Sequence, residues 1–408
     1  MSTPRDDILK IFHSALAAVN GLACVERFLA VRRLKGEVYA LAVGKAAEAM
    51  LLGARSALNG QLRSALLITK PGHVTSGVKA FPEIRVIEAA HPVPDENSLR
   101  AGQAVLDFIA AAPSDAQLLF LISGGTSSLV EVLPEGVSLD DLRRTNQWLL
   151  DSGLDIHGMN ALRKQLSRIK GGRLAAYVQG RSVLQVLISD VSGDNPADIG
   201  SGLLVPEEEG HAKPSSLPAW LQPLLEHAPP QLMDPAYFLN IETHVIASLD
   251  DALGAAALET KKLGYNLQVH TERLNGDAAV AGRQLAGVLI DSPPGVHIWG
   301  GETTVALPPN PGRGGRNQHL ALAAAERLVD RHNIWLLAVG TDGDDGVGGE
   351  AGALVDSGTI LRGSSECMNV ADCLRRADAG SFLQSSGDLI STGPTGTNVM
   401  DMVIGMKQ

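Results

Sequence analysis

The sequence is poor in cysteine, in aromatic residues and in positive charge. Its 408 residues include three cysteines and 4% aromatic residues, and the formal net charge is −11. The cysteines (Cys24, Cys367 and Cys373) are an odd, sparse set that gives no disulfide framework and fits a reducing cytoplasm. A protein that binds nucleic acid needs a basic face, so the negative net charge argues against nucleic acid as the main partner. The net charge does not exclude a local site that binds phosphate.

The sequence also lacks a long apolar run and the pattern of a secretory signal. No apolar segment approaches the roughly 20 residues that cross a bilayer. The first residues include Arg5, Asp6 and Asp7 ahead of a mixed helical pattern, which is not typical of a signal peptide. We therefore expect a cytoplasmic protein with no membrane contact.

Several catalytic motifs are absent, and each absence weakens one class of enzyme. There is no G-x-x-x-x-G-K-[ST] sequence, which argues against a P-loop nucleotide hydrolase. No G-x-G-x-x-G follows a predicted strand, which weakens a nicotinamide-dependent dehydrogenase, and the lack of G-x-S-x-G weakens an α/β-hydrolase. No H-E-x-x-H or Cys/His ligand spacing supports zinc chemistry.

The sequence does contain short apolar runs that alternate with helical periodicity. Such alternation predicts an α/β fold in which helices cover both faces of a parallel sheet. In the N-terminal part we expect strands at residues 37–43, 65–69, 84–89, 118–122 and 183–188. Helices are expected at residues 4–31, 46–58, 97–111, 139–151 and 158–174, with Asn97 as a helix cap.

A second domain is expected because the chain exceeds one ordinary core. Residues 206–235 are rich in Pro, Glu and His, and we interpret them as a linker that divides the chain into domains 1–235 and 236–408. In the second domain we expect strands at residues 243–247, 266–270, 296–299 and 334–339, with 304–306 as a hairpin partner of 296–299. Helices are expected at residues 249–263, 276–290 and 316–330.

Polar or glycine-rich loops follow the predicted strands of the first domain, at the edge where parallel sheets bind ligands. Lys45 follows the first strand at a helix N-terminus, where it can reach phosphate or carboxylate oxygens, or simply be solvated. The sequence SGGTSS after the fourth strand can cradle nucleotide phosphates with backbone N–H groups, or can be an ordinary tight turn. Its residues are Ser123, Gly124, Gly125, Thr126, Ser127 and Ser128.

Two carboxylates lie in the loop after the fifth strand. Asp190 and Asp194 suit Mg²⁺, and either carboxylate can accept a proton from a hydroxyl group; capping of a turn is the alternative. Asp190 is the stronger candidate because it directly follows its strand. His91, between a strand and Pro92, fits a structural role as well as a substrate-binding role.

A basic helix face carries Arg163, Lys164 and Arg168. Such a face is usually solvated, but Arg163 and Lys164 are candidates to steer an acidic substrate. In the second domain, residues 300–318 form a glycine- and proline-rich loop that carries Arg313 and Arg316 to the start of a helix. Two permanently charged side chains at a helix N-terminus suit an anionic ligand.

A further loop, residues 340–346, contains Asp342, Asp344 and Asp345. It resembles a calcium-binding loop only superficially, because its glycine is misplaced and the closing glutamate is absent. An EF-hand is therefore rejected, and a network within a turn is the simpler interpretation.

Motifs along nearly the whole chain resemble the class II glycerate kinases. In chain order, from residue 42 to residue 346, they are AVGKAAEAM, HPVPDENS, SGGTSSL, LRKQLSRIKGGRLA, SDVSGDNPADIGSG, GGETTV, GRGGRNQ and GTDGDDG. The resemblance implies a Rossmann-like N-terminal domain with a doubly wound parallel sheet. It also implies a smaller C-terminal domain of the MOFRL type, an α/β domain with a mixed sheet. One departure is His319, since the family usually has glutamate after GRNQ.

The resemblance also implies a reaction. ATP would transfer its γ-phosphoryl group to D-glycerate with Mg²⁺, giving 2-phosphoglycerate, in a cleft between two domains. The family's catalytic lysine matches Lys45 and its arginine matches Arg316, while Arg313 is expected to be a loop or rim charge. Because members have also been named hydroxypyruvate reductases, an NAD(P)H-dependent reductase is the first alternative. A non-catalytic sugar-acid or nucleotide sensor is the second, and the oligomeric state stays open, with a homodimer among the alternatives.

Overall fold

The chain divides into two compact units in the computed structural model, which describes residues 3–151, 156–206, 217–227, 234–346 and 348–408. The parallel-sheet unit contains residues 21–246, and the mixed-sheet unit contains residues 1–20 together with residues 247–408. This division differs from the expected one at 235/236. Much of the expected linker, namely residues 207–216 and 228–233, lies outside the described residues.

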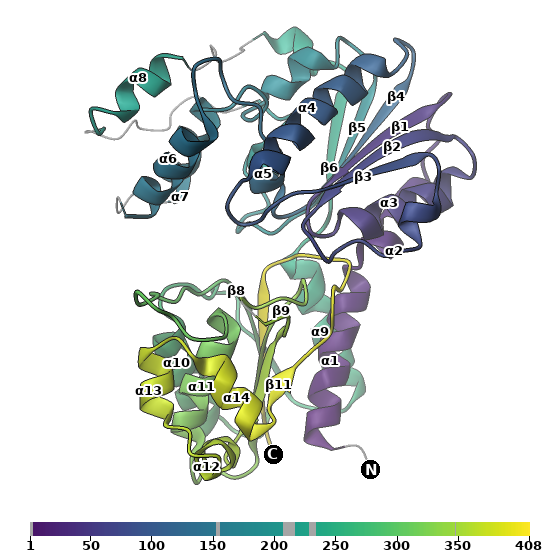
Figure 1. Ribbon diagram of the computed structural model, residues 1–408. Helices are drawn as coiled ribbons and strands as arrows, with labels where there is room; N and C mark the ends of the chain where they lie inside the picture. Colours follow the sequence, from purple (N-terminus) through teal and green to yellow (C-terminus); the bar gives the residue numbers. More distant parts are fainter. Residues whose placement is uncertain (1–2, 152–155, 207–216, 228–233, 347) are drawn as a thin grey trace. The chain divides into compact units, whose positions relative to one another are not determined.

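The parallel-sheet unit has six strands in the order β3-β2-β1-β4-β5-β6 (Figure 1). The ladders that join β1 to β2 and β4, β2 to β3, and β4 to β5 are parallel. The strand bounds are β1 Val38–Val43, β2 Leu62–Thr69, β3 Ile84–Glu88, β4 Gln117–Ile122, β5 Val183–Ile188 and β6 Ile241–Ala247. The strand order reverses direction at β1 and β4, which is the switch point where such sheets bind ligands.

Helices cover both faces of this sheet, as the sequence predicts. Alternate residues of β1 point to opposite faces; Leu41 and Val43 pack in one core with Ala101 and Val105 of α4 (Glu96–Ala111). In Figure 1, α3 (Ala47–Leu58) lies on the other side of the sheet. The remaining α-helices of the unit are α2 Gly21–Ala30, α5 Thr126–Leu129, α6 Leu139–Asp151, α7 Ile156–Gln165 and α8 Leu221–Glu226.

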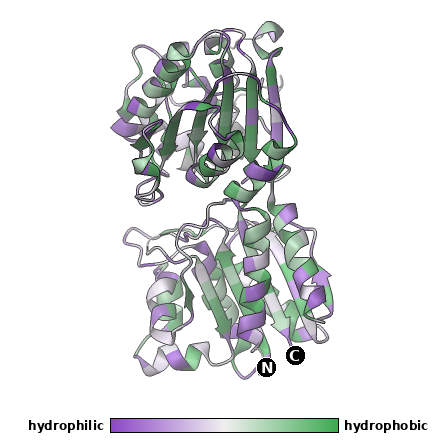
Figure 2. Cartoon of the chain, turned by 90° about the vertical axis from the view of Figure 1, so that its right-hand side faces the viewer, coloured by the Kyte–Doolittle hydropathy of each residue, from purple (hydrophilic) through white to green (hydrophobic). Residues whose placement is uncertain are grey.

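The mixed-sheet unit has the strand order β11-β10-β9-β12-β8-β7, with one parallel ladder between β7 and β8 and antiparallel ladders elsewhere. Its strands are β7 Leu267–Val269, β8 Gly295–Gly301, β9 Ile334–Gly340, β10 Gly352–Asp356, β11 Leu389–Ile390 and β12 Asp401–Lys407. Its α-helices are α1 Pro4–Ala18, α9 Leu249–Lys262, α10 Ala278–Asp291, α11 Arg316–Leu328, α12 Thr359–Ser365, α13 Val370–Arg375 and α14 Ala379–Ser386. In Figure 2 the strands of both units are coloured mainly as hydrophobic, which agrees with their burial.

The expected helix over residues 4–31 is two helices that belong to different units. In the mixed-sheet unit α1 lies beside α9 (Figure 1). Tyr265 donates a hydrogen bond of 2.7 Å to Asp7, and Lys10 pairs with Glu259 at 3.2 Å. Helical periodicity continues almost unbroken through the sequence, so only these distant contacts reveal that α1 joins the C-terminal sheet.

Four smaller expectations were wrong. The strand expected at 243–247 belongs to the first sheet as β6, and the helix expected at 158–174 ends at Gln165. Asp95, not Asn97, caps α4. Residues 304–306 are not a hairpin partner of β8, because β12 already pairs with β8 and Thr304 bridges to Asp277.

Within the described residues no single helix is long and apolar enough to span a membrane. Only α1 and α2 taken together, as a bent pair, have the length and composition of such a segment.

Candidate active site

The loops after β1 and β4 interlock at the switch point of the parallel sheet. Gly44 has φ +125°, and a Cβ there would lie 2.2 Å from the Oγ of Ser123 and 2.6 Å from its carbonyl oxygen. Only glycine permits this approach. The backbone N–H of Lys45 donates to the carbonyl of Gly124 at 2.9 Å, and that of Ala46 donates to Ser123 Oγ at 3.0 Å. The backbone of Lys45 is thus fixed against the SGGTSS loop.

The side chains of Lys45 and His91 meet at Gly125. A Cβ on Gly125 would lie 3.1 Å from Cδ2 of His91 and 3.4 Å from Cγ of Lys45. His73 also joins this group, with its Nδ1 3.3 Å from the carbonyl oxygen of Lys45. The structure therefore brings together Lys45, His91 and the SGGTSS loop. The sequence reasoning missed His73, although it lies in the polar loop after the second strand.

The hydroxyl groups of the SGGTSS loop hold the loop in shape. Thr126 Oγ1 donates to the carbonyls of Ser123 (2.7 Å) and Val43 (3.0 Å), and Ser128 Oγ donates to the carbonyl of Gly125 at 3.1 Å. In the described part of the chain, the backbone N–H groups of Gly124 and Gly125 have no hydrogen-bond acceptor. Gly124 is buried and Gly125 is half-buried, and two such N–H donors beside a lysine form an arrangement that can receive an anion.

A buried ion pair contacts the SGGTSS loop. Lys170 donates a 2.7 Å hydrogen bond to the carbonyl of Ser127 and pairs with Glu131, and both charged side chains are at most 4% exposed. Ser127 Oγ also lies 2.6 Å from the Oγ of Ser201. The sequence reasoning missed Lys170 and Glu131, and only the position of Lys170 just after the basic helix face offered a signal.

The basic helix face is used mainly for internal contacts. Arg163 donates to the side chains of Asn146 (2.9 Å) and Asn160 (3.4 Å), and burial lowers its pKa. Lys164 is buried, and its Nζ lies 3.7 Å from a carboxylate oxygen of Asp198. Exposed Arg168 bonds the hydroxyl of Tyr177 at 3.1 Å. Arg163 and Lys164 are therefore engaged in contacts within the protein, and neither side chain is freely solvated.

Asp190 and Asp194 lie in the loop after β5, and both are half-buried. Asp194 has a φ of +53°, within a turn in which its N–H donates to the carbonyl of Val191 at 3.3 Å. Among the described residues, no group of three or more His, Cys, Asp or Glu side chains is arranged to hold a metal. Mg²⁺ takes one or two carboxylates together with water and substrate phosphates, so a carboxylate of this loop would hold the ion only with those further ligands.

In the mixed-sheet unit, Arg316 is the first residue of α11 and is held by two carboxylates. Its Nε lies 2.5 Å and its Nη2 3.0 Å from the two carboxylate oxygens of Asp401, and Nη2 lies 2.7 Å from Glu302. Burial disfavours the charged guanidinium, but Asp401 and Glu302 outweigh burial and raise the pKa of Arg316. Arg316 is therefore a permanent positive charge with a fixed orientation.

Asp345 fixes the backbone at the same place. Its carboxylate accepts from the N–H groups of Asn317 (3.0 Å) and Gln318 (2.8 Å), which lie in the first turn of α11. Burial raises the pKa of Asp345 to about 7, against the effect of these hydrogen bonds. The other acids of this loop make turn contacts, since Asp344 N donates to Asp342 at 3.1 Å. The interpretation of residues 340–346 as a turn network agrees with these contacts.

Comparison with known proteins covers both units. The family described as "Domain of unknown function (DUF4147)" matches residues 7–221, and the MOFRL family matches residues 295–401. The chain is 36% identical over 389 residues to D-glycerate 2-kinase of Thermotoga maritima and 34% identical over 393 residues to glycerate 2-kinase of Pyrococcus horikoshii. The alignments cover 90% of this chain and 90% of the first relative, and 91% and 87% for the second.

The chain belongs to the glycerate 2-kinase family. A crystal structure of glycerate kinase from Thermotoga maritima superposes with a TM-score of 0.82 and 33% identity, covering 98% of both chains. The family resemblance and the predicted α/β fold, with a parallel and a mixed sheet, are thereby confirmed. A relative from Agrobacterium vitis, 34% identical over 98% of this chain and 93% of its own, is provisionally named a hydroxypyruvate reductase.

His319, at which the sequence departs from the expected motif, is buried in α11. Burial lowers the pKa of its imidazole, so the side chain is neutral near pH 7. The position therefore supplies no negative charge beside Arg316. Arg313 pairs with Glu350 and Gln384, as expected of a charge that shapes its loop.

Proposed function

We propose that this chain is an ATP-dependent glycerate 2-kinase that phosphorylates the C2 hydroxyl group of D-glycerate. The observation that carries the proposal is the position of Lys45 beside the SGGTSS loop, at the switch point of the β3-β2-β1-β4-β5-β6 sheet. Two relatives that share most of the chain's length and bear the name glycerate 2-kinase support this choice of substrate. The reaction belongs in the cytoplasm, where ATP is available and thiols stay reduced.

Each candidate residue has a role in this proposal. The N–H groups of Gly124 and Gly125, within the loop from Ser123 to Ser128, bind nucleotide phosphates. Lys45 and Arg316 bind the substrate carboxylate or the oxygens of the transferred phosphoryl group. His91 contacts glycerate beside Lys45. Lys164 acts on the substrate indirectly, by holding the segment that contains Asp198, and Arg163 does so by holding Asn146 and Asn160.

The transfer itself needs one acceptor for a proton. The C2 hydroxyl oxygen forms a bond to the γ-phosphorus of ATP while the bond from that phosphorus to the β–γ bridging oxygen breaks, and ADP leaves. The hydroxyl proton passes to a carboxylate oxygen of Asp190. Asp190 and Asp194 would hold Mg²⁺, which neutralises phosphate charge when it is bound.

Turnover assays with the full chain test the proposal. Incubation with ATP, Mg²⁺ and D-glycerate should release ADP, and incubation with NADH or NADPH and hydroxypyruvate should oxidise no cofactor. Oxidation of the nicotinamide without ADP release would instead support a reductase. Binding of glycerate or nucleotide without any turnover would support a sensor.

A further inference from the structure

Asp401 is the first residue of β12 and lies between two glycines. In the sheet register it is opposite Gly301 of β8 and Gly340 of β9. A Cβ on Gly340 would lie 3.0 Å from Oδ1 of Asp342 and 3.5 Å from Oδ1 of Asp401. At 3.5 Å, the contact of that Cβ with Asp401 would be an ordinary one, and the carboxylate of Asp401 is 4% exposed. A buried carboxylate requires a partner, and its partner is Arg316.

Asp401 binds Arg316 through two hydrogen bonds, and both are on the same edge of the guanidinium. They use Nε and Nη2 of the guanidinium, and Glu302 also contacts Nη2. The hydrogen bonds to Asp401 do not use Nη1 of Arg316. This geometry holds the planar group in one orientation and leaves the Nη1 edge for an incoming anion.

We propose that Asp401 is a positioning residue that holds the guanidinium of Arg316 in the orientation used for phosphoryl transfer. The inference rests on the proposed function, because it assumes that Arg316 contacts the substrate or the transferred group. Asp345 fixes where α11 begins, while Asp401 fixes where the guanidinium points. A shift of about 1 Å in a group that contacts the reacting atoms can lower a rate about 100-fold.

The same unit contains a second pair that serves as a matched control. Arg362 donates through Nη2 to both carboxylate oxygens of Asp388 at 2.8 Å. Side-chain exposures are 2% for Asp388 and 41% for Arg362, close to the 4% of Asp401 and 35% of Arg316. Asp388 also pairs with Arg5 at 3.2 Å and bonds Ser386.

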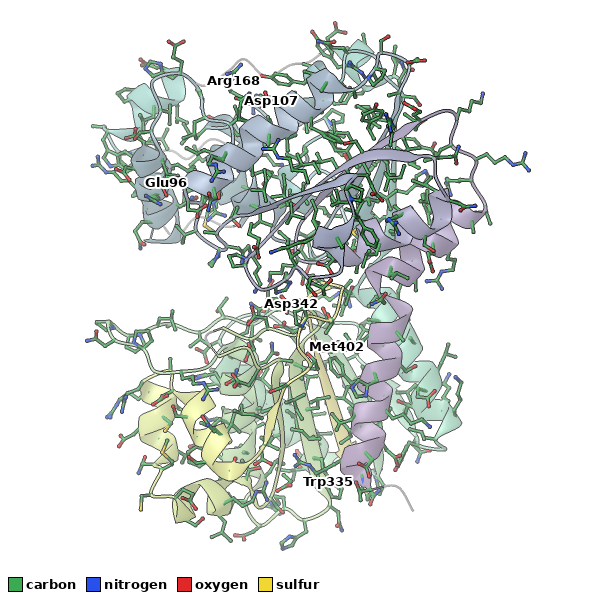
Figure 3. All side chains as sticks on the ribbon, turned by 45° about the vertical axis from the view of Figure 1, so that its right-hand side comes forward. Glu96, Asp107, Arg168, Trp335, Asp342 and Met402 are labelled. Atoms are coloured by element: carbon green, nitrogen blue, oxygen red, sulfur yellow. The ribbon has the colours of Figure 1, made fainter. Side chains whose placement is uncertain are left out.

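The control pair lies far from Arg316 within the unit. Arg362 also binds Asp356, which in the register is opposite Trp335 near the start of β9, whereas Asp401 is opposite Gly340 at its end. Figure 3 shows Trp335 at one end of the sheet, and Asp342 together with Met402, the residue after Asp401, toward the other. A loss of stability is expected in both pairs, but a loss of turnover only in the pair that contains Asp401.

The experiment compares Asp401→Asn with Asp388→Asn in the full chain. We expect Asp401→Asn to lower kcat about 10- to 100-fold with KM for ATP nearly unchanged, and Asp388→Asn to change kcat less than twofold. Because Asp401 acts through Arg316, the double variant Asp401→Asn/Arg316→Lys should be no slower than Arg316→Lys alone. A kcat of Asp401→Asn within threefold of the wild type, or additive losses in the double variant, would overturn the inference.

A second measurement separates this inference from the proposed function. In ¹⁵N NMR spectra, the Nε–H signal of Arg316, assigned by its absence in Arg316→Lys, should move or broaden in Asp401→Asn and stay unchanged in Asp388→Asn. If the wild type does not phosphorylate glycerate but this signal responds as described, the proposed function fails and the positioning of Arg316 stands. An unchanged signal in Asp401→Asn would contradict the positioning itself.

Discussion

The two candidate loop regions hold their key cations in different ways. In the parallel-sheet unit the backbone of Lys45 is bound to Gly124, and the surrounding hydroxyl groups bind backbone carbonyls. In the mixed-sheet unit the side chain of Arg316 is held directly by Asp401 and Glu302. A loop shaped by backbone contacts depends on glycine and close packing, whereas a guanidinium held by carboxylates depends on charge. Substitutions should therefore affect the two regions by different mechanisms.

The largest effect is expected from removal of the cation in the parallel-sheet unit. Lys45→Ala should lower kcat about 10²- to 10³-fold, because one charged donor to the transferred group or substrate is lost. The melting temperature should change little, since Lys45 is only half-buried. Lys79→Ala, which removes a side chain that is 55% exposed, is the control and should change kcat less than twofold. Wild-type turnover in Lys45→Ala would remove Lys45 from the site.

The buried ion pair of Lys170 and Glu131, which contacts the SGGTSS loop, should give the largest change in stability. Lys170→Met leaves the fully buried carboxylate of Glu131 without its cation and should lower the free energy of unfolding by about 3–5 kcal/mol. Lys170→Met/Glu131→Leu should recover most of this loss. Urea denaturation measures both variants. An equal loss in the single and the double variant would show that the pair's charge is not the cause.

Close packing at the switch point gives the next effect. Gly44→Ala should lower the free energy of unfolding by about 2–4 kcal/mol, because its Cβ would overlap Ser123 and its φ is +125°. Gly36 has a φ of +71°, but no atom lies within 4 Å of the place that a Cβ would take, so Gly36→Ala should cost only about 1 kcal/mol. Equal losses in the two variants would show that backbone strain, rather than contact with Ser123, determines the effect.

The last effect comes from charge in the mixed-sheet unit, and it depends on pH. The pKa of Asp345 rises from 3.8 to about 7 on folding, so the folded chain binds a proton that the unfolded chain has released between these values. This contribution to stability is present below pH 4 and is lost as pH rises to about 7, by up to about 1.4 kcal/mol per pH unit. Asp345→Asn should therefore become more stable relative to the wild type between pH 5 and pH 7. Parallel denaturation curves at both pH values would contradict this.

Local patterns in the sequence predicted most strands and the loops that follow them. The apolar runs around Val43 and Ile122 are strands because both of their faces are buried, and the loops after them had to share one edge of a parallel sheet. This shared edge was the right reason to group Lys45 with Ser123–Ser128. Contacts that join distant segments were not predictable in this way.

Two cases show why the rest could not be predicted. The helix α1 has the same periodicity whichever sheet it covers, and its place is determined by contacts with Tyr265 and Glu259. Asp401 lies 85 residues from Arg316, and no spacing rule connects them. The roles of Lys45, Arg316, Asp190 and the other site residues stay predictions.

The most direct test of the central proposal is identification of the phosphorylated product. The full chain would be incubated with ATP, Mg²⁺ and D-glycerate, and the product examined by ³¹P NMR with proton coupling, which distinguishes a phosphate on C2 from one on C3. We predict a single phosphomonoester signal split by one proton, that of 2-phosphoglycerate. A signal split by two protons, from 3-phosphoglycerate, or no phosphomonoester at all would contradict the account.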